Sequence, residues 1–197
     1  MKERPLLFTG PMVRALLDGS KTQTRRVVKA KHLPWLKNSL TNFLDGKWNQ
    51  RPVPYGSPGD RLWVRENGWE RPERTAKMMR EGADTWAPYY FDADGLSEQE
   101  STDFKAWGFK RRPSIHMPRW GSRLTLEITG VRVERLQDIS EADAEAEGID
   151  FIRRAPDVDE TLTAKEFYEA LWESIHGAGS WGLNPWVWVV EFEKVRS

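Results

Sequence analysis

The chain has 197 residues, a length that suits one domain with room for an insertion. Its 30 Lys and Arg balance 30 Asp and Glu, and this zero net charge argues against tight nonspecific binding to duplex nucleic acid through a large basic surface. The chain has no cysteine, which excludes disulfides, thiolate zinc sites and a cysteine nucleophile. We expect a cytoplasmic protein without a membrane span, a metal or a cofactor.

The charges are segregated along the chain. Residues 1–40 carry nine Lys or Arg against two acids, whereas residues 137–173 carry twelve acids against three bases. The two segments either form the two walls of one site or simply attract each other. A small anion pocket remains compatible with the zero net charge.

The amino-terminal elements are predicted from their end signals. Thr9, Gly10 and Pro11 begin a helix, and Gly19 supplies the left-handed residue that ends it. Residues 22–28 are predicted to form a strand. Residues 29–57 contain repeated prolines and glycines and are predicted to be an irregular loop.

The middle of the chain changes pattern twice. A turn at residues 57–60 (SPGD) leads into a predicted strand over residues 61–66. Residues 67–112 alternate acids and bases, with one short strand-like run at Tyr89, Tyr90 and Phe91. We interpret this segment as an insertion that closes over the domain.

The carboxyl-terminal third contains both kinds of element. Residues 123–136 are predicted to form one long strand, or a hairpin about Thr129 and Gly130. A capping-box-like start at Ser140 predicts a short acidic helix that ends at Gly148, and a second helix follows over residues 163–175. With a last strand over residues 186–195, the order predicts an α+β fold whose strands curl into a small barrel.

The basic segment that follows Gly19 is the first candidate site. In a regular strand Lys21 and Arg25 would share one face, and Thr24 and Arg26 the other, so Lys21 meets Thr24 only if the chain is still turning at residues 20–22. A lysine beside two guanidiniums should have a lowered pKa and could then activate the Thr24 hydroxyl as a nucleophile. By spacing alone, a solvated basic strand edge is the favoured interpretation.

Two further groups are candidates. Arg61, Trp63 and Arg65 share one strand face and suit backbone binding with base stacking, or packing beneath the insertion. Asp143 and Glu147 share one face of the acidic helix, and the helix dipole disfavours a carboxylate in the last turn, where Glu147 lies. Glu147 is therefore a general acid/base or the partner of a lysine, or else part of a plain solvated helix, which composition favours.

Eleven tryptophans are many for this length. Burial in the core and anchoring of loops is the favoured interpretation for any single one, and stacking on nucleic-acid bases is the alternative. The three histidines, His32, His116 and His176, show no metal-ligand spacing.

Four segments together resemble the ASCH domain family. They are residues 17–26 (LDGSKTQTRR), 58–66 (PGDRLWVRE), 135–149 (RLQDISEADAEAEGI) and 184–192 (NPWVWVVEF), the last of which fits the larger bacterial and phage members. The resemblance runs over residues 5–195 as a single domain and skips most of residues 29–57 and 67–112. It implies a PUA-like small β-barrel with flanking helices and a cleft associated with RNA.

The family's usual signature is Gly-x-Lys-x-x-Glu-x-Arg. Gly19, Lys21 and Arg26 match it, but Thr24 stands where many members have Glu. This departure resembles a small ASCH enzyme that hydrolyses N4-acetylcytidine, in which a Lys, a Thr and a Glu form the proposed catalytic set. Carried over by position, these residues are Lys21, Thr24 and Glu147.

Three functional hypotheses follow for an RNA or modified-nucleoside partner. The first is a hydrolase of an N4-acylated cytidine-type amide, in which Arg26 and backbone N–H groups stabilise the oxyanion. The second is a ribonuclease that uses the same cleft, since other ASCH proteins are described as single-strand ribonucleases. The third is a non-catalytic single-stranded RNA-binding module. The residues predicted to bind substrate or RNA are Arg25, Arg26, Arg61, Trp63, Arg65 and Glu66.

Overall fold

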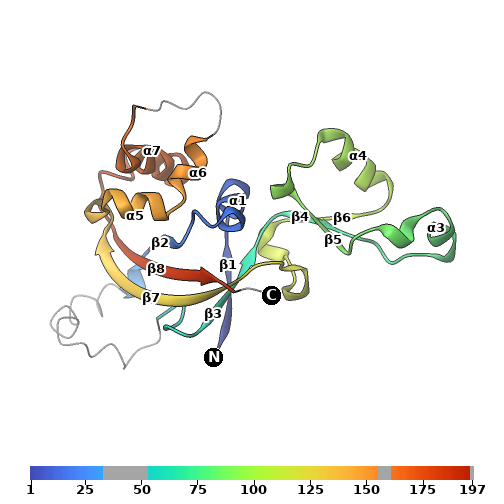
Figure 1. Ribbon diagram of the computed structural model, residues 1–197, viewed down its shortest axis with the longest axis horizontal. Helices are drawn as coiled ribbons and strands as arrows, with labels where there is room; N and C mark the ends of the chain where they lie inside the picture. Colours follow the sequence, from blue (N-terminus) through green and yellow to red (C-terminus); the bar gives the residue numbers. More distant parts are fainter. Residues whose placement is uncertain (33–52, 155–160, 196–197) are drawn as a thin grey trace.

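The computed structural model describes residues 1–32, 53–154 and 161–195. Its main element is a five-stranded mixed sheet of order β1-β3-β7-β8-β2 (Figure 1). β1 and β3 are parallel and the other neighbours are antiparallel. The strands are β1 (Glu3–Leu7), β2 (Gln23–Val27), β3 (Arg61–Arg65), β7 (Thr125–Arg135) and β8 (Trp186–Lys194).

Helices pack against this sheet and bury two apolar clusters. Helix α1 (Gly10–Asp18) begins after Thr9, has Pro11 in its first turn and ends at the left-handed Gly19, as predicted. One cluster lies beneath α1 and includes Val13, Leu62, Leu126 and Phe192. The second cluster lies between the sheet and the helices that follow β7. These are α5 (Glu141–Ala146), α6 (Ile149–Arg153) and α7 (Ala164–His176).

The carboxyl-terminal elements agree with one of the predicted alternatives and differ from the prediction in one detail. Of the two forms predicted for residues 123–136, the structure has the single long strand, β7, with a register shift between Ile128 and Gly130. A Cβ on Gly130 would lie 2.3 Å from a carboxylate oxygen of Glu191, so a larger residue here would displace the end of that side chain. The helix that begins after Ser140 is followed at once by α6, because Gly148 adopts a left-handed conformation that turns the chain.

The α+β class is confirmed, but the strands do not form a closed barrel. β1 and β2 are the two edges of the sheet, and no backbone ladder joins them among the described residues. One side chain links these edges: the Arg26 guanidinium donates to the Leu7 carbonyl oxygen over 2.7 Å. The sheet therefore curls, and its ends are connected through an arginine.

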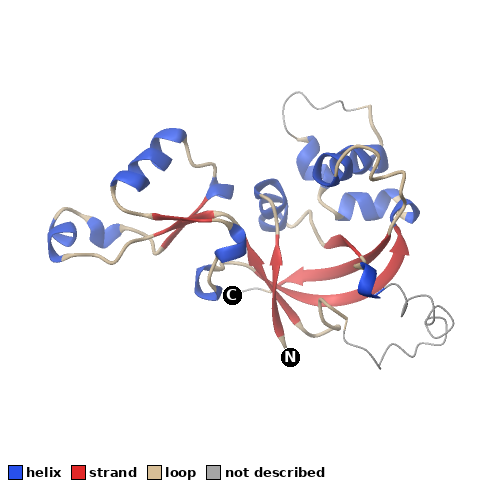
Figure 2. Ribbon diagram, turned by 180° about the vertical axis from the view of Figure 1, so that it is seen from behind, coloured by secondary structure: helices blue, strands red, loops and turns tan. Residues whose placement is uncertain are grey.

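Residues 68–112 form a separate small module, the insertion. Three short strands of order β5-β4-β6 make its sheet, and the rings of Trp69, Phe104 and Phe109 form its own core. Figures 1 and 2 show that it extends to one side of the main sheet, so it does not close over the domain as we expected. Its elements are β4 (Gly68–Glu70), α3 (Ala76–Arg80), β5 (Tyr89–Phe91), α4 (Glu98–Ala106) and β6 (Lys110–Arg112).

Six short 3-10 turns connect these elements in the described ranges. They are η1 (Ala30–His32), η3 (Ala83–Thr85), η4 (Asp92–Asp94), η5 (Ser114–His116), η6 (Arg119–Gly121) and η7 (Leu136–Asp138). The turn η4 joins the insertion to the main sheet, because Ala93 packs in the cluster beneath α1 and its carbonyl accepts a hydrogen bond from Arg14. Much of the predicted 29–57 loop lies outside the described residues. In the part of the chain that is described, no helix is long and apolar enough to cross a membrane.

Candidate active site

Lys21 is held in a fixed position between α1 and α5. Its backbone N–H donates to the Ala15 carbonyl oxygen just after the left-handed Gly19, and Lys21 forms an isolated antiparallel bridge with Glu147. A Cβ on Gly148 would lie 3.0 Å from the Ala15 Cβ and 3.2 Å from the Lys21 Cβ. The glycine that ends α5 is therefore what allows the two segments to approach so closely.

The Lys21 and Glu147 side chains form a buried ion pair. The Lys21 Nζ lies 2.6 Å from the Glu147 Oε2 and 2.7 Å from the Glu147 carbonyl oxygen. The two side chains are 1% and 5% exposed. Burial lowers the pKa of Lys21 below its ordinary value, with the nearby guanidiniums acting in the same direction and Glu147 opposing it. The pair therefore combines a carboxylate with an amine that loses its proton more readily than a free lysine.

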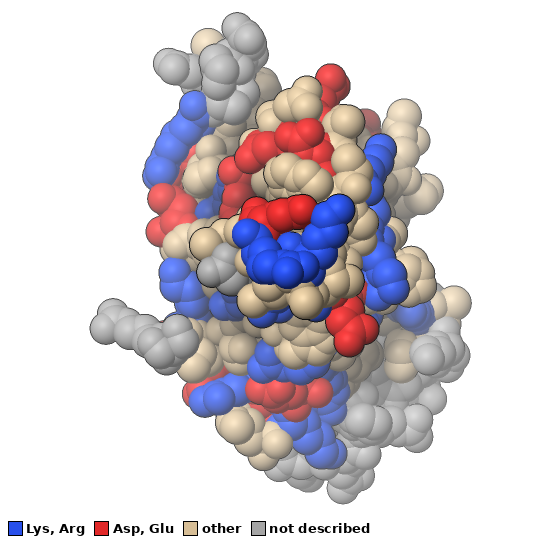
Figure 3. Space-filling model, turned by 90° about the vertical axis from the view of Figure 1, so that its right-hand side faces the viewer, with Lys and Arg blue, Asp and Glu red and all other residues tan. Residues whose placement is uncertain are grey.

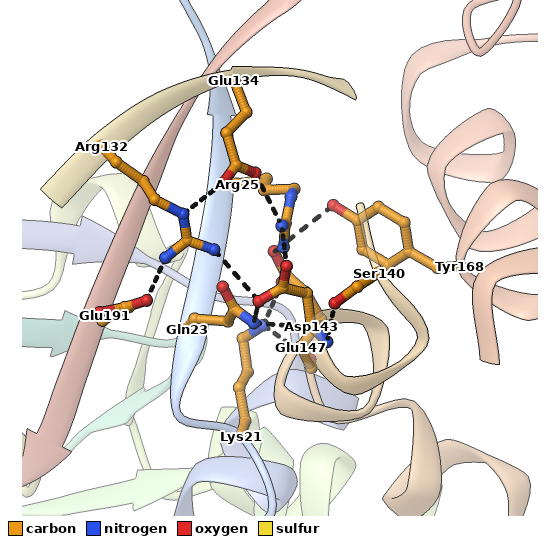
Figure 4. Close-up of polar contacts among 10 residues, drawn as sticks. All are labelled: Lys21, Gln23, Arg25, Arg132, Glu134, Ser140, Asp143, Glu147, Tyr168 and Glu191. Atoms are coloured by element: carbon orange, nitrogen blue, oxygen red, sulfur yellow. Dashed lines mark hydrogen bonds and ion pairs between the residues drawn. The ribbon is translucent and has the colours of Figure 1, made fainter. Parts of the chain in front are cut away.

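Gln23 and Arg25 extend this contact along β2 (Figure 4). The Gln23 side-chain amide donates to the Asp143 carboxylate over 2.8 Å and to the Asp143 carbonyl oxygen over 2.9 Å. The Arg25 guanidinium lies 3.2 Å from both Asp143 and Glu134 and 3.5 Å from Glu147. The basic amino-terminal segment and the acidic helix thus form the two walls of one cluster.

Arg132 on β7 connects the outer side of the cluster. Its guanidinium binds the carboxylates of Glu134, Asp143 and Glu191. Burial alone would raise the pKa of Asp143, but the Gln23 hydrogen bond and the Arg25 charge outweigh it, so the pKa of Asp143 is lowered. Asp143 is therefore held as a carboxylate between the guanidiniums of Arg25 and Arg132.

Tyr168 on α7 faces the second Glu147 oxygen. Its hydroxyl donates to the Glu147 Oε1 over 3.5 Å, and burial followed by the Glu147 charge raises the pKa of Tyr168 well above its ordinary value. The phenol stays protonated as a hydrogen-bond donor. Glu147 is consequently held by Lys21, by Arg25 of β2 and by Tyr168 of α7.

Thr24 lies next to this cluster but is not part of its hydrogen-bond network. The β2–β8 register pairs Thr24 with Val190 without interruption, so its side chain is on the sheet face opposite to Gln23 and Arg25. The residue is 3% exposed. Among the described residues, the Thr24 hydroxyl makes no hydrogen bond to Lys21 or Glu147. The structure brings Lys21 and Glu147 together and leaves Thr24 behind the strand.

The residues predicted to contact RNA do not form one open surface. The Arg25 side chain is 0% exposed within the carboxylate cluster, and Arg26 donates to Leu7 with its guanidinium 5.3 Å from the Phe8 ring centroid. β7 and β8 separate β3 from β2 in the sheet. The residues on β3 therefore form a group of their own.

Within the β3 group, Trp63 is packed between cations. It is 8% exposed, with the guanidiniums of Arg65 and Arg119 at 4.8 and 5.8 Å from its ring centroid. Arg61 lies 3.7 Å from Glu127. The indole is thus covered by arginines of β3 and η6, which lie outside the insertion, and not by the insertion as the packing alternative had it.

Glu66, at the end of β3, binds an arginine at the junction with the insertion. Arg123 donates to both Glu66 carboxylate oxygens at 3.0 Å and also pairs with Asp94 of η4. Burial raises the pKa of Glu66, and Arg123 opposes this shift. Glu66 therefore anchors the insertion to the main sheet.

Sequence reasoning missed Arg132, Glu134, Glu191 and Tyr168. These residues come from β7, β8 and α7, and no short-range spacing links them to Lys21. The alternation of β2 did indicate that Gln23 would share a face with Lys21. Over the described ranges, we find no group of three or more His, Cys, Asp or Glu side chains arranged to hold a metal ion.

Comparison of the chain with known proteins adds no assignment: no family model, no curated protein and no solved structure matches it. The chemistry of the site must therefore be argued from its geometry.

Proposed function

We propose that the protein hydrolyses an N4-acylated cytidine-type amide, and that Lys21 and Glu147 transfer the protons. The observation that carries the proposal is the 2.6 Å contact between a buried lysine amine and a buried carboxylate. Amide hydrolysis needs a base for the attacking group and an acid for the leaving amine. A lysine with a lowered pKa can be the base, and the adjoining carboxylate can pass the proton on.

The proton path follows from the contacts. The Lys21 amine removes a proton from the attacking hydroxyl while the new C–O bond forms at the acyl carbon. The resulting ammonium gives a proton through Glu147 to the leaving amine as the C–N bond breaks. If Thr24 attacks, Arg26, which shares the sheet face of Thr24, supplies positive charge for the oxyanion, a contribution of about 3 kcal/mol for one well-placed donor.

The attacking hydroxyl belongs to Thr24 or to a water molecule. Attack by Thr24 gives an acyl-threonine ester that water then hydrolyses, and it requires residues 20–24 to turn the hydroxyl toward Lys21. Attack by water needs no such turn, and the position of Thr24 on the opposite sheet face favours it. Thr24→Val and Thr24→Ser separate the two: attack by Thr24 predicts that only the serine variant is active.

The resemblance to the ASCH family also carries a proposal about architecture. The curled mixed sheet, flanked by α1, α5 and α7, supports a PUA-like arrangement. The Arg26–Leu7 hydrogen bond that links the two sheet edges supports it as well. In such an arrangement the site lies where β2 meets α5.

Release of free acid from N4-acetylcytidine tests the proposal. Wild type should release acetate, and Glu147→Gln and Lys21→Arg should lower the rate by about 100-fold or more, since general acid–base catalysis contributes that much. The rate should rise with pH through the folded pKa of Lys21, which lies below 10.5, because the neutral amine is the active form. Lys21→Arg should abolish this dependence, because a guanidinium keeps its proton.

Thr22→Val is the matched control, because Thr22 is an exposed hydroxyl two residues from Thr24. It should leave the rate unchanged. Absence of acetate release by wild type, or equal rates in Lys21→Arg and wild type, would refute the hydrolase. Incubation with end-labelled single-stranded RNA separates the two other hypotheses: cleaved RNA indicates a ribonuclease, and bound but intact RNA indicates a binding module.

A further inference from the structure

Two tryptophans of the insertion form a stacked pair at the surface. The rings of Trp86 and Trp107 have centroids 5.4 Å apart and planes inclined by 24°. Trp107 is 46% exposed, although the edge of its ring also contacts Phe104. Trp107 therefore presents flat aromatic surface to the solvent.

The pair is held rigidly from below. The centroids of the Trp86 and Phe109 rings lie 5.2 Å apart. The backbone carbonyl oxygen of Trp86 accepts a hydrogen bond from the Arg71 guanidinium. Trp107 ends α4, where its N–H donates to the Asp103 carbonyl oxygen over 2.8 Å. The next residue, Gly108, has φ +81° and turns the chain back into β6. Little conformational entropy is lost when a flat ligand packs on such a prearranged ring.

Two lysines lie near Trp107 along the chain. Lys105 and Lys110 lie two residues before and three residues after Trp107, and both are exposed. Within the described residues, neither lysine forms an ion pair. Lysines and arginines also gather at the centre of the face that this end of the molecule presents (Figure 3). Flat aromatic surface next to unneutralised cations matches the chemistry of bases joined by phosphates.

We propose that the insertion binds single-stranded nucleic acid, with a base stacked on Trp107 and the flanking phosphates bound by Lys105 and Lys110. The charge favours this ligand over a second protein surface, because an apolar protein contact gains nothing from two unpaired lysines at its centre. The site lies on the insertion and does not depend on the chemistry of Lys21 and Glu147.

Trp120 provides a matched comparison. It is 58% exposed, and among the described residues its ring contacts the edge of Tyr89 at 6.3 Å and 82°, while the neighbouring Arg119 is paired with Glu3. Over that part of the chain, Trp120 is as exposed as Trp107 but has no stacked ring.

Fluorescence anisotropy of a short labelled oligouridylate tests the proposal. Wild type should bind at low salt, and Trp107→Ala should weaken binding by about 5- to 150-fold, the range expected for loss of one stacked base. Trp107→Phe should keep part of the affinity, and Trp120→Ala should keep all of it. Lys105→Ala with Lys110→Ala should reduce the slope of log K against log salt by roughly 1.4, because each lost phosphate contact removes about 0.7.

The outcomes that would overturn the proposal are distinct. Absence of binding by wild type at low salt, or equal affinity in Trp107→Ala and wild type, rejects the site. An equal loss in Trp120→Ala shows nonspecific association. Self-association that depends on Trp107, without binding of the oligonucleotide, identifies a protein interface instead. Binding that persists in Glu147→Gln keeps this site separate from the hydrolase.

Discussion

The contact between β2 and α5 and the core of the insertion are stabilised in opposite ways. At the first, Lys21, Arg25 and Glu147 are buried together and neutralise one another. In the second, the rings of Trp69, Phe104 and Phe109 pack together and the charged groups stay at the surface. In a packed aromatic core, the free energy of unfolding falls in proportion to the atoms removed. When a buried charge loses its partner, the whole cost of its desolvation lowers the stability at once.

The difference suits two kinds of function. A cluster of buried charges fixes the position and protonation of a few atoms, which chemistry requires. A rigid aromatic module on one side of the main sheet offers a surface, which binding requires. Glu66, Arg123 and Asp94 form an ionic joint between the main sheet and the insertion.

The largest effect should follow removal of one buried charge. Lys21→Met removes the 2.6 Å partner of Glu147, which is 5% exposed and keeps the longer 3.5 Å contacts to Arg25 and Tyr168. This change should lower the free energy of unfolding by about 3–5 kcal/mol in urea titrations. Adding Glu147→Leu should restore much of this loss, because an apolar pair has no charge to desolvate.

Lys77→Met is the control from the insertion. Lys77 also pairs with a glutamate, Glu81, but at 79% and 62% exposure. Its removal should change stability too little to resolve. If Lys21→Met lowered the free energy of unfolding no more than Lys77→Met, burial of the Lys21–Glu147 pair would not determine its contribution to stability.

Two left-handed glycines sharpen the same comparison. Gly148 has φ +92° and Gly82 has φ +96°, but only Gly148 has neighbours within reach of an added Cβ. Gly82→Ala should cost about 1–2 kcal/mol from backbone strain alone. Gly148→Ala should cost about 2–4 kcal/mol, because overpacking against Ala15 and Lys21 is added. Equal losses of melting temperature in both variants would show that the close approach of α5 to Lys21 carries no strain.

How much the sequence could predict depends on the distance over which each feature is encoded. Helix α1 was predicted because Pro11 and Gly19 lie within it or next to it. The short strands β4 and β6 were missed, because three residues of mixed charge show no periodicity and Gly68 pairs with Arg112, far along the chain.

The candidate site shows the same limit. Charge segregation indicated that the basic segment and the acidic helix attract each other, and Lys21 does meet Glu147. Arg132 and Glu191 join the cluster only through the β7–β8 register, which no local pattern specifies. Strand alternation predicted the sheet face on which Thr24 lies. The sequence could not predict whether the chain still turns at residues 20–22, which decides whether Thr24 meets Lys21.

The smallest predicted effect compares two capping boxes, and it tests whether the two regions unfold together. Ser97 caps α4 in the insertion and Thr163 caps α7 on the main sheet, and each hydroxyl accepts a hydrogen bond from an N–H in the first turn. Each change to alanine should cost about 1 kcal/mol. In native-state hydrogen exchange, Thr163→Ala should reduce protection across the main sheet, whereas Ser97→Ala should reduce it only in residues 68–112, because the insertion has its own core. A loss of protection that spreads over both regions in either variant would mean that the ionic joint at Glu66 couples them into one cooperative unit.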